Sequence, residues 1–340
     1  MGSKVELARD GDHMLGAFIP LHYHFPMLAN PVRMLGFKEA IATVVPTGST
    51  VLELGAGTGV MSFFAAQRAA RVIAIERLPE NVEAARTFLR NNGAGDRVTV
   101  IQADAYEFLP TSPVDVVICE LLHTALLREH QAEVIARFKD RYLDRFGPPL
   151  PRFIPEAIIM AVQPLEQGFD FFGYEVPLPI FADGFSTQRE GNTAKELAPP
   201  QNYAGFEYRN AYPEQFAWSG EFTIGESGVL NALRFVTKNV LAILVDENRT
   251  VDWLMQYLVL PLSKPLTVTR GQVVDIGFDY AAGAPIHDLR TLSGSRSRSE
   301  EGSVCRKRRT SHAHARAVRS FVQDVGGRRG PGRLRVADSG

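Results

Sequence analysis

Three glycines alternate with other residues at Gly55, Gly57 and Gly59, directly after an apolar run and before a stretch with helical spacing. Glycine tolerates a positive φ and lets the backbone approach a ligand without interference from a Cβ atom. The loop that cradles a dinucleotide pyrophosphate has the spacing G-x-G-x-x-G. Here the spacing is G-x-G-x-G, and the acidic Glu53 precedes it. An acid at this place disfavours a pyrophosphate and suits a ligand that carries an ammonium group.

Two further acids follow the next two apolar runs. Glu76 ends the run 71–76, where a carboxylate can accept hydrogen bonds from both hydroxyls of a ribose. Asp104 follows the run 98–102, where it can accept from an adenine amino group while the backbone N–H of Ala105 or Tyr106 contacts the ring. Ligands of open α/β sheets bind at the carboxyl ends of the strands. These residues therefore predict an adenosine-containing ligand. S-adenosylmethionine is favoured, and an NAD-dependent oxidoreductase is the alternative.

The segments around these residues alternate between strand and helix. We predict strands at 50–54, 71–76, 98–102 and 114–119, with helices at 60–68 and 79–91. Short apolar strands between helices predict an α/β fold with a mostly parallel, doubly wound sheet and right-handed crossovers. We expect a Rossmann-like domain over 13–155, with a helix that starts at Pro31, after a loose N-terminus at 1–12.

The character of the sequence changes after Pro155. Short runs rich in β-branched and aromatic residues are separated by Pro, Gly and Asn, and one stretch, Val229–Thr237, has helical spacing. Such runs are typical of an antiparallel barrel or sandwich. We expect a smaller β-rich substrate domain over 156–290.

The last fifty residues differ from the rest in charge. Residues 291–340 hold twelve Lys and Arg and four Asp and Glu, whereas the other 290 residues hold 25 and 34. Low hydrophobicity without periodicity predicts a disordered basic tail, which is either a segment that binds anionic surfaces or out-of-frame sequence. The acidic body disfavours a nucleic-acid partner and is compatible with a cationic substrate.

Composition also restricts the compartment. Two cysteines exclude a disulfide framework, and no apolar run approaches the ~20 residues that span a bilayer. No charged start followed by an apolar stretch and a small-residue cleavage site is visible. We expect a cytoplasmic protein with no membrane partner. The eight histidines show no metal-ligand spacing, so we expect no metal site.

The sequence resembles the protein arginine methyltransferase family over about residues 22–156 and again over 250–279. The segment from His24 to Arg33 is similar to the helix that closes over the cofactor in that family. The resemblance implies a class I S-adenosylmethionine-dependent methyltransferase in which His24 and Arg33 are polar cofactor contacts. Arg33 would pair with the methionine carboxylate through its planar guanidinium.

A second match follows the predicted strand at 114–119, where Glu120 and Glu129 stand nine positions apart. In the family, two glutamates at this separation lie on a hairpin after the fourth strand and hold the substrate guanidinium. Two carboxylates suit a guanidinium because it offers five donors in a rigid plane. The resemblance implies that Glu120 and Glu129 are the catalytic residues and position the nucleophile for in-line attack on the sulfonium methyl group.

A third match begins at Thr250, where the family has Thr-His-Trp. Here Val251 and Asp252 replace the threonine and the histidine, whereas Trp253 remains. The resemblance implies that Asp252 and Trp253 belong to the substrate site. An aspartate strengthens a pocket for a cation, but it does not reproduce the donor and acceptor properties of a neutral imidazole.

Together the motifs predict methyl transfer from S-adenosylmethionine to a guanidinium-like nitrogen in a protein or peptide. A small-molecule N-, O- or C-methyltransferase on the same fold is the first alternative, because the Thr-His-Trp position is altered. A catalytically silent scaffold is another. A nucleic-acid amino-methyltransferase is disfavoured, since Cys-Glu-Leu-Leu stands where Asn/Asp-Pro-Pro-aromatic is typical. The resemblance also implies a homodimer.

Overall fold

The computed structural model describes residues 21–182 and 193–295. The loose N-terminus predicted at 1–12 lies outside these ranges, as do residues 296–340 of the predicted tail. Within the described residues, no helix is both long enough and apolar enough to cross a membrane.

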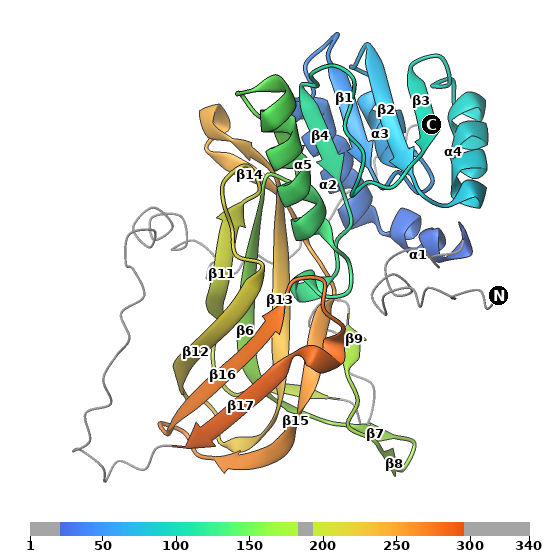
Figure 1. The fold of residues 1–340 in the computed structure, drawn as a ribbon. Coiled ribbons are helices and arrows are strands. Elements are labelled where there is room, and N and C mark those ends of the chain that lie inside the picture. The colour runs from blue at the N-terminus through green and yellow to red at the C-terminus, as the bar shows by residue number, and fades with distance from the viewer. Residues whose placement is uncertain (1–20, 183–192, 296–340) are drawn as a thin grey trace, which may run out of the picture. The chain divides into compact units, whose positions relative to one another are not determined.

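A five-stranded parallel sheet forms the first part of the described chain (Figure 1). Its strand order is β3-β2-β1-β4-β5, so the direction of chain progression reverses between β1 and β4. Ligands of doubly wound sheets bind outside the carboxyl ends of the strands at such a reversal. The strands are β1 (Thr50–Leu54), β2 (Arg71–Glu76), β3 (Val98–Gln102), β4 (Val116–Cys119) and β5 (Arg152–Ile154).

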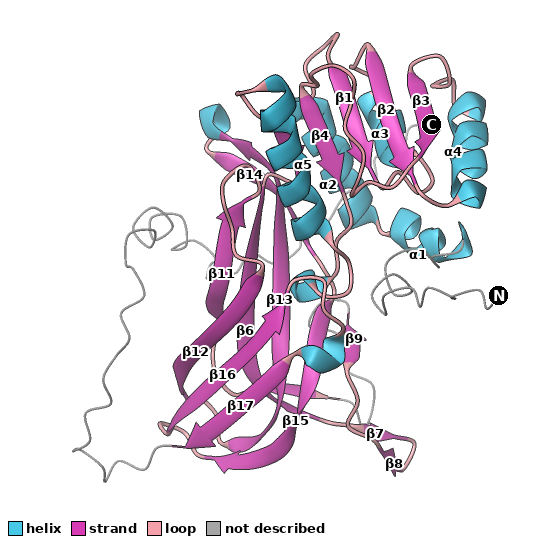
Figure 2. Ribbon diagram, in the orientation of Figure 1, coloured by secondary structure: helices cyan, strands magenta, loops and turns pink. Residues whose placement is uncertain are grey.

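Helices connect and cover these strands (Figure 2). They are α1 (His24–Ala29), α2 (Pro31–Val44), α3 (Val60–Ala65), α4 (Pro79–Asn91) and α5 (Gln131–Phe146). Helix α2 begins at Pro31, as predicted, because a proline at the first helical position gives up no needed hydrogen bond. The side chain of Asn30 caps it by accepting from the backbone N–H of Arg33 at 3.0 Å. This cap fixes the start of the helix that carries Arg33.

Antiparallel strands follow the parallel sheet. The larger group contains β6 (Ala157–Gln167), β9 (Ile180–Ala182), β10 (Ala194–Glu196), β11 (Gln201–Glu207), β13 (Gly228–Leu244), β14 (Arg249–Leu254) and β15 (Tyr257–Val268). A second group contains β12 (Gln215–Thr223), β16 (Val273–Ala281) and β17 (Arg290–Ser295), and a small hairpin joins β7 (Asp170–Phe171) to β8 (Tyr174–Glu175). The predicted order, a parallel Rossmann-like sheet followed by an antiparallel β domain, is confirmed.

Two details of the sequence prediction are wrong. The stretch Val229–Thr237 is part of the long strand β13 and not a helix. Strands β6 and β15 pair with this stretch on its two edges, so hydrogen bonding between strands overrides the local spacing. Residues 291–295, assigned to the tail, belong to β17 and pair with β16. The change of composition is therefore not a structural boundary at residue 291.

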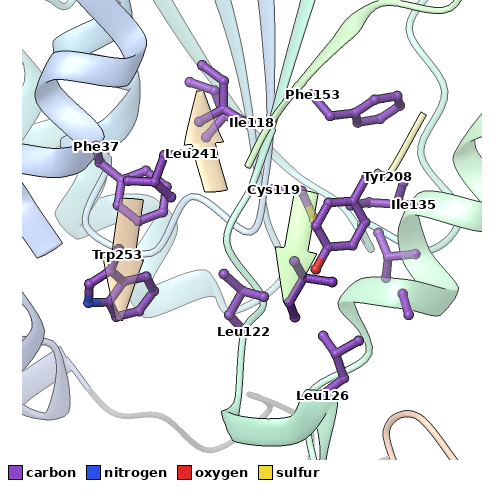
Figure 3. Packing of buried hydrophobic residues seen from close by; sticks show 14 of the residues in the cluster. Phe37, Ile118, Cys119, Leu122, Leu126, Ile135, Phe153, Tyr208, Leu241 and Trp253 are labelled. Carbon is purple, nitrogen blue, oxygen red and sulfur yellow. The ribbon is translucent and has the colours of Figure 1, made fainter. Parts of the chain in front are cut away.

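One hydrophobic core runs from the parallel sheet into the antiparallel strands. Figure 3 shows Trp253 beside Phe37, and their ring centroids are 5.8 Å apart. Figure 3 also shows Cys119, the last residue of β4, next to the buried ring of Tyr208. The end of β4, which precedes Glu120, therefore packs against a residue that directly follows β11.

Candidate functional site

A cavity of about 410 Å³ lies at the carboxyl ends of β1, β2 and β4. Its wall comes from α1, α2, the glycine loop, the ends of the strands and the start of α5. The predicted residues that line it are His24, Arg33, Glu53, Gly55, Gly57, Glu76, Asp104, Ala105, Glu120 and Glu129. The structure thus gathers both predicted catalytic glutamates and all predicted cofactor residues except Gly59 around one space.

Two of the three glycine positions leave no room for a Cβ atom, because neighbouring side chains lie too close. Gly55 has φ +82°, and a Cβ on it would lie 2.5 Å from Cδ2 of Leu121. Gly57 has φ +52°, and a Cβ on it would lie 2.7 Å from Cε1 of His24. Gly59 does not line the cavity; it precedes α3 with φ +81° and packs against Leu89. The third glycine therefore serves helix packing, which corrects its assignment to the cofactor site.

The carboxylate of Glu76 is held at both oxygens. Oε2 accepts from the backbone N–H of Gly57 at 2.8 Å, and Oε1 accepts from that of Leu78 at 2.9 Å. Each carboxylate oxygen has a second lone pair, so Glu76 retains acceptor capacity for hydroxyl groups. Its orientation and its link to the glycine loop fit the ribose contact predicted from sequence.

Asp104 stands at the rim of the cavity with its side chain 45% exposed. Its Oδ1 accepts from the backbone N–H of Tyr106 at 2.9 Å. This bond closes a tight turn that brings Ala105 to the cavity wall. The turn presents an acid and a small apolar side chain side by side, which suits the edge and the face of an adenine.

Glu53 lies at the floor of the cavity and is almost fully buried. Burial raises the pKa of Glu53 to about 8, although a hydrogen bond from the hydroxyl of Ser62 opposes the shift. A buried carboxyl of this kind gains from a neighbouring cation, because the cation favours its ionised form. Glu53 is therefore suited to an ammonium group.

Arg33 and Glu120 form a buried ion pair, with Nη2 of Arg33 2.5 Å from Oε2 of Glu120. The guanidinium carbon lies 5.6 Å from the ring centroids of Phe37 and of Trp253. Trp253 is buried and does not line the cavity, so it supports the site by packing against Arg33. This position outside the cavity lining corrects the assignment of Trp253 to the substrate site.

Glu129 lines the same cavity as Glu120, so the two form an acidic pair. Burial and, to a smaller extent, the neighbouring charge of Glu120 raise the pKa of Glu129 to about 8. Burial also raises the pKa of Glu120, whereas Arg33 opposes that shift. Two carboxyls that disfavour each other's ionisation are stabilised by a shared cation.

The loop between the two glutamates is strained and firmly anchored. Ala125, Leu126 and Arg128 have φ values of 60°, 56° and 63°, which non-glycine residues rarely adopt. The hydroxyl of Thr237 on β13 accepts from the backbone N–H of Ala125 at 2.7 Å. The carbonyl of Ala284 accepts from the N–H of Arg128 at 2.9 Å. The antiparallel strands thus hold the conformation that places Glu129 near Glu120.

His24 supplies a polar atom without a partner. Its Nε2 is buried and has no hydrogen bond within the described part of the chain. Burial lowers the pKa of His24, so its ring is neutral and can either donate or accept. An unpaired buried nitrogen beside a glycine cradle fits a polar ligand, and S-adenosylmethionine has hydroxyls and a carboxylate to satisfy it.

Asp252 is not part of the cavity. It lies on β14, and its Oδ2 is 2.6 Å from Nζ of Lys238 on β13. The carboxylate is therefore used in an ion pair between adjacent strands, which corrects its assignment to the substrate site. The sequence alone does not show which residue of β13 lies next to Asp252, so this ion pair could not be predicted.

Sequence reasoning missed three residues at the start of α5. Gln131 is fully buried, and its Oε1 accepts from the backbone N–H of Leu121 at 2.8 Å, directly after Glu120. His130 and Glu133 line the cavity. His130 and Glu133 stand three positions apart at the start of a helix, a spacing that brings two side chains together, and this was the signal in the sequence. In the ranges 21–182 and 193–295, no group of three or more His, Cys, Asp or Glu has the geometry of a metal site.

Comparison with known proteins gives consistent results. Residues 51–142 match the family described as "Methyltransferase domain". The chain is 33% identical to an uncharacterized protein of Methanothermobacter thermautotrophicus over 269 residues, which are 78% of this chain and 95% of the relative. It is 34% identical to protein arginine N-methyltransferase 2 of Xenopus tropicalis over 136 residues, which are 39% of this chain and 31% of that protein.

Solved structures show the same fold. A Trypanosoma brucei structure titled as the PRMT1 enzyme-prozyme heterotetrameric complex with AdoHcy matches with a TM-score of 0.62. The match covers 81% of this chain and 97% of that chain at 16% sequence identity. At this identity the likeness concerns the arrangement of both sheets and not the identity of the substrate.

Proposed function

The chain belongs to the class I S-adenosylmethionine-dependent methyltransferases related to the protein arginine N-methyltransferases, and on this premise we propose that it methylates an arginine guanidinium nitrogen in a protein or peptide. The observation that carries the proposal is the acidic pair of Glu120 and Glu129 in a cavity that also holds the glycine cradle.

One member of the pair, Glu120, already binds a guanidinium in this structure. Within the chain itself, Glu120 binds the guanidinium of Arg33 at 2.5 Å. Glu129 lines the cavity beside it and carries a raised pKa of about 8, because it is buried and faces Glu120. A substrate guanidinium brings a positive charge and up to five donors, so it relieves both the burial and the mutual repulsion of the two carboxyls.

The remaining residues divide the work of holding the cofactor. S-adenosylmethionine, when bound, supplies a sulfonium methyl group. Gly57 and Glu76 fit its ribose, and Asp104 with Ala105 fits its adenine. Glu53 fits its ammonium group, and Arg33 offers the remaining donors of its guanidinium to a carboxylate.

Glu120 and Glu129 act on the acceptor by orientation and charge. By binding two edges of a guanidinium, they draw its positive charge toward the bound nitrogens and leave electron density on the nitrogen that is methylated. Holding reactants in attack geometry can supply ~7–11 kcal/mol of the barrier. The strained loop anchored at Thr237 keeps the two carboxyls in place for this purpose.

Transfer of labelled methyl groups to matched peptides tests the proposal. We expect methylation of an arginine peptide and none of the same peptide with lysine in place of arginine. Glu120→Gln should lower kcat by about 10²- to 10³-fold, because one buried charged contact is lost, an effect of about 3–4 kcal/mol. The Kd for S-adenosylhomocysteine should stay within about fivefold. As a matched control, Glu221→Gln changes an exposed glutamate of β12 and should keep full activity.

Two results would contradict the proposal. Equal labelling of the lysine and arginine peptides would mean that the acidic pair does not recognise a guanidinium. Labelling of a small molecule from a cell extract, with no peptide labelled, would replace the proposal by the small-molecule alternative, which the ion-paired Asp252 outside the cavity leaves open.

A further inference from the structure

Two residues of the cavity have no part in the proposed roles above. His130 directly precedes α5, and Glu133 lies in the first turn of this helix. Both line the same cavity as Glu120 and Glu129. Their side chains face each other, with Nδ1 of His130 in hydrogen-bond contact with Oε2 of Glu133.

The contact with Glu133 determines which nitrogen of the imidazole is basic. An ionised carboxylate only accepts hydrogen bonds, so Nδ1 carries the hydrogen of a neutral ring. Nε2 then carries the lone pair. A histidine whose Nδ1–H is directed at a carboxylate is the arrangement used where an imidazole must take up a proton at Nε2.

The ring of His130 is also held from the other side. Gly283, in the turn after β16, has φ +76°, and a Cβ on it would lie 2.8 Å from both Cε1 and Nδ1 of His130. The backbone N–H of Gly283 donates to the carbonyl of Leu126 at 2.8 Å, which fixes this turn against the loop between Glu120 and Glu129. The imidazole therefore lies between Glu133 and a backbone that approaches too closely for any side chain.

The proposed reaction releases a proton. The acceptor nitrogen uses its lone pair to form a bond to the methyl carbon, and the electron pair of the broken C–S bond stays on sulfur. The nitrogen then loses one hydrogen as a proton, while the N–H bonding pair remains on nitrogen. The methylated guanidinium keeps its single positive charge, so the released proton needs an acceptor other than the product.

The two catalytic glutamates are not free to keep this proton. Glu120 and Glu129 must stay ionised to hold a guanidinium, and Arg33 stabilises the ionised form of Glu120. Glu133 is the charged group that contacts His130, and Glu129 lines the same cavity. Glu133 reaches solvent with 41% of its side chain exposed, and His130 with 25%. The pair therefore connects the cavity to the surface.

We propose that His130, oriented by Glu133 and by the turn at Gly283, takes up the proton released by the acceptor nitrogen and passes it to solvent. This inference rests on the proposed function, because it requires an acceptor nitrogen that carries hydrogen. It assigns a catalytic role to His130 and a positioning role to Glu133.

Kinetics of three variants with the arginine peptide test the role of His130. His130→Gln should lower kcat by about 10²-fold and leave the KM for the peptide and the Kd for S-adenosylhomocysteine within threefold, as expected for a lost proton acceptor. Glu133→Gln should lower kcat by about tenfold. His287→Gln is the matched control, because His287 lies beside Asp288 in a similar pair but is 81% exposed. It should behave as the unmodified protein.

Two further readouts separate proton uptake from a structural role. In His130→Ala, added imidazole should restore at least a tenth of the lost kcat, because it can occupy the vacated space and accept the proton. In the proton NMR spectrum of the unmodified protein, a downfield imidazole N–H signal should be present. It should disappear in His130→Gln and in Glu133→Gln and remain in His287→Gln.

The outcomes distinguish this inference from the proposed function. If the unmodified protein methylates arginine peptides and His130→Gln keeps kcat within threefold, the inference is overturned and the proposed function stands. Failure of imidazole to restore His130→Ala, in a variant that still binds S-adenosylhomocysteine normally, also overturns it. If the unmodified protein does not methylate arginine peptides, both proposals are overturned together.

Discussion

Replacing Gly57 by alanine perturbs the cofactor site at a defined point. The residue has φ +52°, and placing an alanine in this left-handed region costs about 1–2 kcal/mol of folding free energy. The new Cβ would also lie 2.7 Å from Cε1 and 3.3 Å from Nδ1 of His24, so the imidazole must move. The N–H of Gly57 holds Glu76 at 2.8 Å, and a shifted loop weakens this bond as well.

The effect on binding follows from these contacts. Loss of the ordered His24 ring and of a well-placed Glu76 carboxylate removes one or two hydrogen bonds to the ligand, each worth about 1–1.5 kcal/mol. The Kd for S-adenosylhomocysteine should therefore rise about 10- to 100-fold, since each 1.4 kcal/mol is a factor of ten.

Gly48→Ala is the matched control for backbone strain. Gly48 has φ +81°, but a Cβ on it would meet nothing within 4 Å. Both variants should lose about 1–2 kcal/mol in urea unfolding. Isothermal titration calorimetry should show weaker binding only for Gly57→Ala. Equal Kd values for the two variants would refute the reasoning that the Gly57–His24 contact forms the cofactor site.

Three further predictions concern other parts of the chain. Burial raises the folded-state pKa of Glu53 to about 8, above the unfolded value of about 4.3. The protonated carboxyl of Glu53 therefore contributes fully to stability below a pH of about 4.3, and this contribution is lost as the pH rises through about 8. Urea unfolding at a series of pH values should show this loss, and Glu53→Gln should flatten the pH dependence. Asp252→Asn should keep kcat within about threefold, because its carboxylate pairs with Lys238 outside the cavity; a 100-fold loss in the peptide assay would return it to the substrate site. The homodimer implied by the resemblance remains a prediction, and the exposed side chains of Phe25 (72%) and Val32 (62%) offer one surface for it. If this surface is the interface, replacing both residues by glutamate should lower the mass measured by sedimentation. An unchanged dimer would place the interface elsewhere.

Local features of the sequence were sufficient to predict which residues lie at the carboxyl edge of the parallel sheet. The apolar runs give the parallel strands, and the residues that follow them lie at one edge of the sheet whatever the rest of the chain does. Glu76 and Asp104, singled out from their positions alone, both line the cavity, and their contact with a cofactor stays a prediction. Gly59 follows the same pattern, but Leu89 of α4 determines its role, and that contact is not encoded locally.

Features that depend on pairing between distant segments could not be predicted. The ion pair of Arg33 with Glu120 joins residues 87 positions apart, and Thr237 anchors Ala125 across 112 positions. The role of Asp252 depends on the register of β13 and β14, since a shift by one residue would turn its side chain to the other face. His130 stands beside Gly283 only because the turn after β16 packs against the loop between Glu120 and Glu129.

A crystal structure of the protein with S-adenosylhomocysteine and an arginine peptide would test the central claim most directly. We expect the peptide guanidinium to lie between Glu120 and Glu129, with at least one nitrogen within about 3.2 Å of each carboxylate. The adenosyl group should lie against Gly57, Glu76 and Ala105. A guanidinium bound outside this acidic pair, or a cavity filled by a different part of the peptide, would contradict it.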